Sequence, residues 1–214
     1  MAEPAVDRGR GRRPTRIRRV LGLDRSGPPP AQTEAGQPLR PWTLPNVIGF
    51  ARLALIPVFL VVAFSSGDGT GFWPCALFFV IGWGDYFDGL AARLTGQYSR
   101  LGALLDPITD RLLLLAGALV AWHFQLLPRW ALAVLVAREV AMLVVGRYAL
   151  ARGVPVRINW PGRLAVAPLA GSIFFAMAGL RTFAEVLLYV GLALALWASA
   201  LYAQAARRAL DVQS

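Results

Sequence analysis

Four carboxylates stand at helical spacing inside a stretch that is otherwise apolar enough to lie within a membrane. Asp88 follows Asp85 by three positions, and Asp110 follows Asp106 by four. On a helix, each of these pairs lies on one face. A single aspartate at the centre of a membrane-spanning helix costs roughly 2.5–3.5 kcal/mol. Four of them require positive charge in their midst, and a pair of divalent metal ions is its simplest source.

The composition indicates an integral membrane protein with basic edges. Of the 214 residues 57% are hydrophobic, yet 22 basic against 12 acidic residues give a formal net charge of +10. A soluble domain of this length would expose too much apolar surface. A single cysteine and a single histidine exclude a disulfide framework and a His/Cys metal cluster. All 22 basic residues are arginine, a bias typical of high-GC bacterial genomes, so we expect an all-α, polytopic protein of a bacterial inner (cytoplasmic) membrane.

The first 42 residues differ from the rest of the chain. They carry nine arginines against four acidic residues and few apolar side chains. Such a segment cannot offset its ordering entropy by burial, so we expect a disordered, basic, cytoplasmic tail over residues 1–42. It lacks the apolar core of about 7–15 residues of a cleavable signal peptide. Without interleaved aromatic residues for base stacking, it is not expected to bind nucleic acid. The membrane domain should cover residues 43–208, and a short C-terminal tail residues 209–214.

Long apolar runs alternate with short polar breaks beyond the tail. Each run is long enough, at about 1.5 Å per residue, to cross a hydrocarbon layer of ~30 Å. The six expected spans are residues 47–65, 72–94, 101–123, 129–152, 163–180 and 183–206. Arginines gather in the tail, in alternate breaks and at the C-terminal end, whereas the other breaks offer only Arg129 and Arg181. An even number of spans then places both termini on the arginine-rich side, which is the cytoplasmic side.

The two aspartate pairs fall in consecutive spans joined by a short break, so an antiparallel hairpin should bring them together on the cytoplasmic side. Hard oxygen donors suit Mg²⁺ or Mn²⁺. Two such ions ~4 Å apart can clamp a pyrophosphate. Gly89 and Gly102 would let a nucleotide approach the helix backbone, and Arg93 can bind phosphate. Structural Arg–Asp pairs, or an ion- or proton-conducting helical bundle, are the alternatives, but neither requires glycines at these positions.

The complete pattern, D-x-x-D-G-x-x-A-R-x₈-G-x-x-x-D-x-x-x-D over residues 85–110, resembles the signature of the CDP-alcohol phosphotransferase (phosphatidyltransferase) family at all eight defined positions. The resemblance extends over residues 44–205. It implies six transmembrane helices, commonly a homodimer, and two divalent metal ions. The implied reaction transfers a phosphatidyl group from CDP-diacylglycerol to an alcohol and releases CMP.

The resemblance also assigns roles to individual residues. The aspartates that resemble the metal ligands are Asp85, Asp88, Asp106 and Asp110, and the last of them also resembles the catalytic general base. The expected contacts to the CDP-lipid are Asn46, Gly89, Arg93, Ser99 and Gly102. Asn46 can equally be a helix cap that contacts no ligand.

Two further segments bear on the acceptor alcohol. Leu44-Pro45-Asn46, followed by Arg52 and Pro57, is similar to the start of the first span in bacterial phosphatidylglycerophosphate synthases and in the related cardiolipin synthases. Ala137-Arg138-Glu139 resembles the glycerophosphate enzymes, but those usually carry Gly-Lys-x-Lys-Thr where this chain has Gly-Arg-Leu-Ala-Val at 162–166. The Ala-Arg-Glu resemblance makes glycerol-3-phosphate the leading acceptor. The departure at 162–166 makes phosphatidylglycerol, which would give cardiolipin, its rival, and an inositol-type alcohol comes third.

Four arginines are candidates to bind an acceptor phosphate: Arg138, Arg147, Arg157 and Arg163. Arg138 is the strongest of them, because a cation inside a span is costly unless it has a partner. Glu139 beside it projects about 100° away around the helix. We therefore expect the partner of Arg138 to be a metal-site aspartate or the phosphate of a bound acceptor.

Overall fold

The protein is seen here in a computed structural model that describes residues 38, 41–151 and 160–211, and of these it describes the backbone alone at residues 148–151, 161, 163 and 205–211. Nearly all of the expected basic tail lies outside the described residues, as do residues 212–214 at the C-terminal end.

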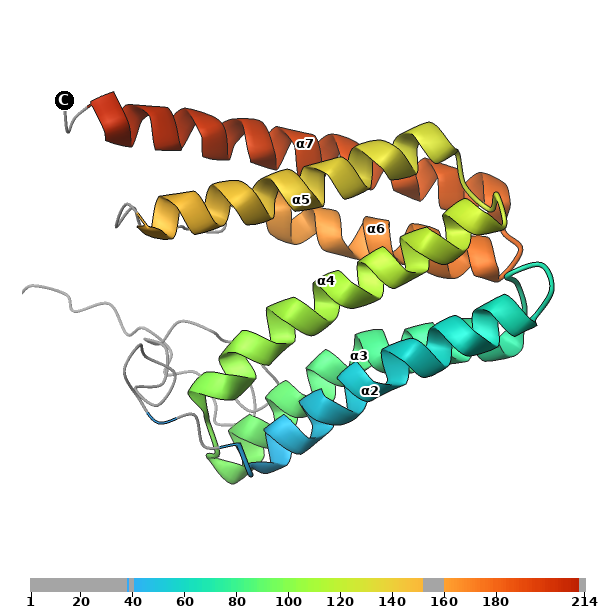
Figure 1. Ribbon diagram of the computed structural model, residues 1–214, viewed down its shortest axis with the longest axis horizontal. Coiled ribbons are helices and arrows are strands. Elements are labelled where there is room, and N and C mark those ends of the chain that lie inside the picture. Colours follow the sequence, from blue (N-terminus) through green and yellow to red (C-terminus); the bar gives the residue numbers. More distant parts are fainter. Residues whose placement is uncertain (1–37, 39–40, 152–159, 212–214) are drawn as a thin grey trace, which may run out of the picture.

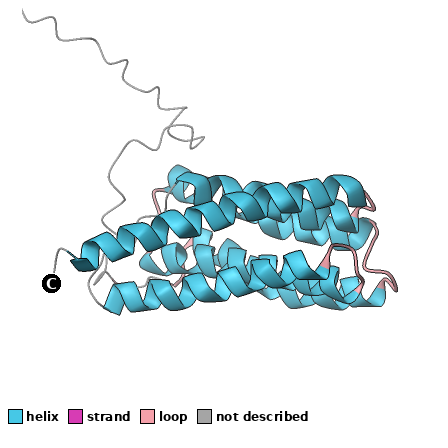
Figure 2. Cartoon of the chain, turned by 90° about the horizontal axis from the view of Figure 1, so that it is seen from above, coloured by secondary structure: helices cyan, strands magenta, loops and turns pink. Residues whose placement is uncertain are grey.

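The described residues form six helices, which confirms the all-α prediction (Figures 1 and 2). Their bounds are α2 Leu44–Ser65, α3 Phe72–Thr95, α4 Arg100–His123, α5 Arg129–Ala151, α6 Trp160–Met177 and α7 Arg181–Asp211. The expected spans coincide with these helices apart from their ends. The largest difference is in α7, which continues to Asp211, past the expected end at 206.

Successive helices run back and forth, so that their ends alternate between two sides of the molecule. The connections α2–α3, α4–α5 and α6–α7 lie together at one end, while the start of α2, the α3–α4 connection and the end of α7 lie at the other (Figure 1). As a consequence α2 and α4 run in the same direction and pack against each other, with α3 antiparallel to both.

Local sequence explains where the helices around the α3–α4 connection begin and end. Thr43 precedes α2, and its side chain accepts a hydrogen bond from the backbone N–H of Asn46. Ser99 precedes α4 and accepts one from the N–H of Gly102 in the same way. Both are the short hydroxyl side chains that cap helix N-termini. Gly96 ends α3 in the left-handed region at φ 67°, where a side chain would be strained.

Among the described residues, three helices are long and apolar enough by themselves to cross a membrane: Leu44–Ser65, Phe72–Thr95 and Arg181–Gln204. Helices α4 and α5 have comparable length, with 24 and 23 residues. They carry more charge, because α4 contains two of the aspartates and α5 contains Arg138 beside Glu139. In α6 the apolar part described is shorter, Leu164–Met177.

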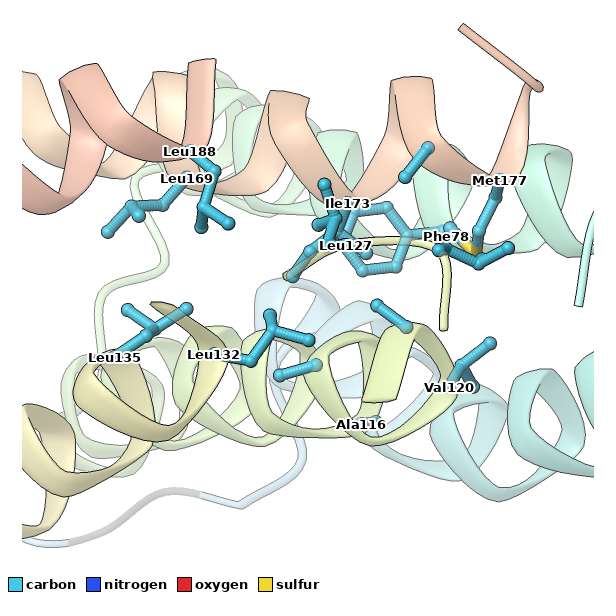
Figure 3. Close-up of a cluster of buried hydrophobic side chains, with 14 of the residues drawn as sticks. Phe78, Ala116, Val120, Leu127, Leu132, Leu135, Leu169, Ile173, Met177 and Leu188 are labelled. Atoms are coloured by element: carbon cyan, nitrogen blue, oxygen red, sulfur yellow. The ribbon is translucent and has the colours of Figure 1, made fainter. Parts of the chain in front are cut away.

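One buried apolar cluster holds the helices together (Figure 3). Its members come from every described helix, among them Phe59, Phe78, Val120, Leu132, Ile173 and Leu188. Gly117 allows α4 to approach α6 and α3 closely, since a Cβ there would lie 2.6 Å from Ile173 and 2.7 Å from Phe78. Native interiors do not tolerate such overlap. The cluster therefore fixes α4, and with it two of the four aspartates, relative to the other helices.

Candidate active site

The α3–α4 hairpin gathers three of the four aspartates, as the sequence predicts. Asp85 and Asp88 lie on α3 and Asp106 on α4, and each offers a carboxylate oxygen within 4.8 Å of the others. Asp88 is buried and Asp85 is exposed. Three converging carboxylates are a donor set of the kind that hard divalent cations prefer. This part of the predicted metal site is therefore formed by residues that fit a divalent ion.

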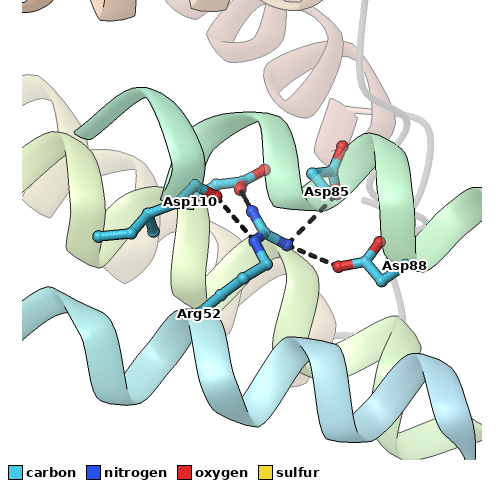
Figure 4. A network of polar contacts seen from close by, with 5 residues as sticks. Arg52, Asp85, Asp88 and Asp110 are labelled. Atoms are coloured by element: carbon cyan, nitrogen blue, oxygen red, sulfur yellow. Dashed lines mark hydrogen bonds and ion pairs between the residues drawn. The ribbon is translucent and has the colours of Figure 1, made fainter. Parts of the chain in front are cut away.

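A cation of the protein itself lies among these carboxylates: Arg52 of α2 (Figure 4). Its Nη1 donates to Asp88 Oδ2 at 2.8 Å, and its Nη2 donates to Asp110 Oδ1 at 2.9 Å. Asp85 is farther away, with its Oδ1 3.8 Å from Nη1. Asp110 thus joins the other aspartates through the guanidinium group, and its side chain remains 46% exposed.

The arginine is held by α3 as well as by the aspartates. Its Nε donates to the backbone carbonyl of Ile81 at 2.9 Å, and Arg52 as a whole is only 3% exposed. Gly84, one turn further along α3, leaves the space that the arginine stem occupies, because a Cβ at this glycine would lie 2.5 Å from Arg52 Cδ. The space between α2 and α3 therefore matches the side chain of Arg52.

Three of the predicted CDP-lipid contacts meet where α2 and α4 begin. Ser99 Oγ donates to Asn46 Oδ1 at 2.8 Å, and Gly102 N donates to Ser99 Oγ at 2.9 Å. A Cβ at Gly102 would lie 2.8 Å from Asn46 Oδ1, so this glycine leaves room for the asparagine. Asn46 is 1% exposed and Ser99 5%. In the structure these three residues bind one another and join α2 to α4.

The other two predicted contacts, Gly89 and Arg93, lie one helical turn apart on α3. The guanidinium of Arg93 passes over the glycine, where a Cβ would lie 3.3 Å from Arg93 Nη1. Both residues are partly exposed, on the helix that carries Asp85 and Asp88. A phosphate can thus reach an arginine close to the carboxylate cluster.

The expectation that Glu139 cannot be a partner of Arg138 is wrong. Its Nη1 donates to Oε1 of the neighbouring Glu139, and its Nε donates to Ser199 Oγ on α7 at 3.1 Å. Adjacent side chains start about 100° apart around the helix, but a long arginine side chain can curve back to an adjacent glutamate. Arg138 therefore belongs to a partly buried contact between α5 and α7.

The remaining acceptor candidates are less defined. Arg147 is exposed near the end of α5. Arg157 and the side chain of Arg163 lie outside the described residues. The structure thus brings neither Arg138 nor Arg147 into contact with the aspartates.

Sequence reasoning missed Arg52, although it noted the motif that contains this residue. The available signal was its isolation: it is the one charged residue of α2, which otherwise consists of apolar residues, glycine, proline, asparagine and a terminal serine. An arginine without an acidic neighbour on its own helix must find its counter-charge on another helix.

Comparison with known proteins agrees with the geometry. The sequence profile of the CDP-alcohol phosphatidyltransferase family matches residues 42–197, which include all four aspartates and Arg52. The chain belongs to this family. The match begins two residues before α2 and ends within α7, so the phosphatidyltransferase region takes in α2 to α6 and the first part of α7.

Bacterial relatives in the family carry two different names. The "Cardiolipin synthase (CMP-forming)" of Streptomyces coelicolor is 34% identical over 166 residues, covering 75% of this chain and 77% of that protein. The "CDP-diacylglycerol--glycerol-3-phosphate 3-phosphatidyltransferase" of Escherichia coli is 30% identical over 182 residues, covering 78% and 96%. The Bacillus subtilis protein of the same name is 31% identical over 135 residues, covering 58% and 70%. The relatives thus include both leading acceptor classes.

Proposed function

We propose that this protein transfers a phosphatidyl group from CDP-diacylglycerol to an alcohol and releases CMP. The carboxylate cluster of Asp85, Asp88 and Asp106, within 4.8 Å, carries the proposal, because it lies within the residues that match the family. A conducting helical bundle would need no such converging donors beside an arginine. The named activities of the Streptomyces and Escherichia relatives support the same reaction.

We propose that Asp85, Asp88, Asp106 and Asp110 hold two divalent ions, Mg²⁺ or Mn²⁺. When bound, such ions neutralise the charge that develops on a pyrophosphate during displacement at phosphorus. The residues fit this role, since carboxylate oxygens from adjacent helices converge within reach of one another. Asp110, which Arg52 joins to the cluster, completes the set.

The protein's own groups would perform the remaining steps. Asp110 is half exposed, so its carboxylate can accept the proton of an acceptor hydroxyl. The resulting oxygen attacks the lipid-side phosphorus of CDP-diacylglycerol. The bond from that phosphorus to the bridging oxygen breaks, and the oxygen leaves as part of CMP. Arg93, beside Gly89, would bind the phosphates of the CDP group.

A lipid substrate also agrees with the surface next to the site. An apolar groove of about 320 Å³ lies between α2 and α4, and its lining residues are Leu53, Ile56, Pro57, Leu60, Leu112, Leu115, Ala116 and Leu119. It begins at the residue after Arg52 on α2 and two residues after Asp110 on α4. Because α2 and α4 run in parallel, it leads away from the carboxylates along both helices. An acyl chain attached to a headgroup at the aspartates fits this position.

The membrane arrangement follows from the same features. We propose six spans in the bacterial inner membrane, with both termini and the aspartates on the cytoplasmic side. The clustering of the start of α2, the α3–α4 connection and the end of α7 at one end supports an even number of crossings. A homodimer is the assembly that the family resemblance implies, and light scattering of the detergent-solubilised protein would test it.

We propose phosphatidylglycerol, giving cardiolipin, as the acceptor. Two observations favour it over glycerol-3-phosphate: Arg138 is already engaged by Glu139 and Ser199, and the segment at 162–166 lacks the second cation and the hydroxyl of the glycerophosphate enzymes. The Streptomyces relative supports the same choice. Glycerol-3-phosphate remains the second candidate, favoured by the Escherichia and Bacillus relatives.

The decisive experiment supplies the purified protein with CDP-diacylglycerol and one acceptor at a time, and identifies the lipid product by mass spectrometry. Cardiolipin from phosphatidylglycerol would support the proposal. Phosphatidylglycerophosphate from glycerol-3-phosphate would select the second candidate. No CMP release with either acceptor or with inositol-type alcohols would overturn the transferase proposal itself.

A further inference from the structure

Arg52 has an acceptor for each nitrogen of its guanidinium group. Nε donates to Ile81 O, Nη1 to Asp88 Oδ2 and Nη2 to Asp110 Oδ1, at 2.9, 2.8 and 2.9 Å. These acceptors come from α3 and α4, whereas the arginine comes from α2. The planar guanidinium is suited to such contacts because its donors have fixed directions. One side chain thus connects the three helices that surround the carboxylates.

The neighbouring backbone is shaped around this side chain. At Gly84 a Cβ would lie 2.5 Å from Arg52 Cδ, 2.8 Å from its Cγ and 2.8 Å from its Nε. At Gly82, two residues earlier on α3, a Cβ would meet only Leu113 Cδ2, at an ordinary 3.6 Å. The requirement for glycine at position 84 is therefore set by the arginine and not by close helix packing in general.

We propose that Arg52 is a positioning residue of the phosphatidyl-transfer site, which holds Asp88 and Asp110 in place and supplies the positive charge between them when no metal ion is bound. The proposal rests on the proposed function. Each of these aspartates gives one oxygen to Arg52, which leaves its other oxygen for the site. Arg52 is buried and also bonded to Ile81, so it stays in place and does not move to a substrate.

The contribution of Arg52 to stability can be measured without turnover. In metal-free protein, removal of Arg52 takes away the cation that binds both Asp88 and Asp110. Bound divalent ions supply that charge, so the loss of stability should be larger without metal than with it. An arginine that only packed between helices would give the same loss under both conditions.

The first experiment measures thermal unfolding midpoints in detergent, in EDTA and in saturating Mn²⁺, for the wild type, Arg52→Gln and Arg52→Lys. The expected result is a midpoint deficit for Arg52→Gln that is clearly larger in EDTA than in Mn²⁺. Arg52→Lys should have the smaller deficit in EDTA, because it keeps the charge. Equal deficits of Arg52→Gln under the two conditions would overturn the proposal.

The second experiment displaces Arg52 by adding a Cβ at the neighbouring Gly84, so the charged side chain itself is unchanged. Gly84→Ala should reproduce the larger midpoint deficit in EDTA, whereas its matched control Gly82→Ala should not. In the Arg52→Ala background, the Gly84→Ala change should add little further deficit, because the atoms it would collide with are gone. Additive effects in this cycle would show that Gly84 acts independently of Arg52 and would contradict the proposal.

Kinetics then separate positioning from substrate binding. We expect Arg52→Lys to lower kcat by about 10²-fold, because one ammonium group cannot hold both carboxylates, while the KM for CDP-diacylglycerol stays near the wild-type value. A raised KM at unchanged kcat would instead make Arg52 a substrate contact. Should the wild type release no CMP at all, the proposed function fails, whereas the unfolding midpoints still decide whether Arg52 balances the carboxylates.

Discussion

Ser99 Oγ donates a hydrogen bond of 2.8 Å to Asn46 Oδ1 and so joins the start of α4 to the start of α2. Arg52 follows Asn46 by less than two helical turns, and Asp106 follows Ser99 by about two. The bond therefore fixes the axial register of the two parallel helices. This register determines the level along the helix axes at which Arg52 meets the aspartates.

Replacing Ser99 by alanine should destabilise the protein. The change removes both the bond to Asn46 and the cap on the N–H of Gly102. Loss of a helix cap costs about 0.5–2 kcal/mol, and the buried amide oxygen of Asn46 loses the hydrogen bond from Ser99 as well. Unfolding in detergent would measure the effect, with Ser65→Ala at the exposed end of α2 as the control. Equal stability of the two variants would show that the junction does not hold the helices in register.

Removal of divalent metal should abolish CMP release. The carboxylates of Asp85, Asp88 and Asp106 face one another within 4.8 Å, and we expect catalysis to require ions bound between them. Treatment with EDTA should stop CMP release from CDP-diacylglycerol, and Mg²⁺ or Mn²⁺ should restore it. Undiminished turnover in chelator would contradict the metal proposal.

Asp110→Asn should lose nearly all turnover while preserving the local structure. Asparagine keeps an oxygen that can accept from Arg52 Nη2, but it cannot take a proton from the acceptor hydroxyl. Loss of general-base assistance lowers rates typically by about 10²–10⁴-fold. Binding of CDP-diacylglycerol, measured by titration, should be kept better than in Asp88→Asn. Turnover within a few-fold of wild type would remove Asp110 from the role of base.

Arg138→Ala should act on stability and not on acceptor binding. Glu139 is 5% exposed and would lose its cationic partner. Breaking a buried ion pair by removing one member costs about 3–5 kcal/mol, and the partial exposure of Arg138 places the expected loss at or below the lower end. Thermal unfolding and the acceptor KM should be measured together, with exposed Arg129→Ala as the control. A strongly raised acceptor KM in an equally stable protein would show instead that Arg138 binds the acceptor.

The carboxylate cluster was predictable because the information for it is local. The two aspartate pairs stand at helical spacing on consecutive helices, and the short turn between them leaves one way to pack. The order of the helices followed from the same alternation of apolar runs and breaks. Neither inference required knowledge of how distant segments meet.

The contacts of Arg52 were not predictable in this way, because its partners Asp88 and Asp110 lie 36 and 58 residues away. They depend on how α2 packs against α3 and α4. The contact of Arg138 with Ser199, across 61 residues, has the same origin. Its bond to Glu139 was missed for a different reason, since side-chain reach was not considered.

Every described contact of Arg52 with the carboxylates and with Ile81 lies within α2, α3 and α4. In the described part of the chain, the later helices reach this site through packing, because Gly117 of α4 lies against Ile173 of α6 in the buried cluster. A substitution that enlarges this contact, such as Gly117→Ala, would therefore displace Asp106 and Asp110 without changing a carboxylate.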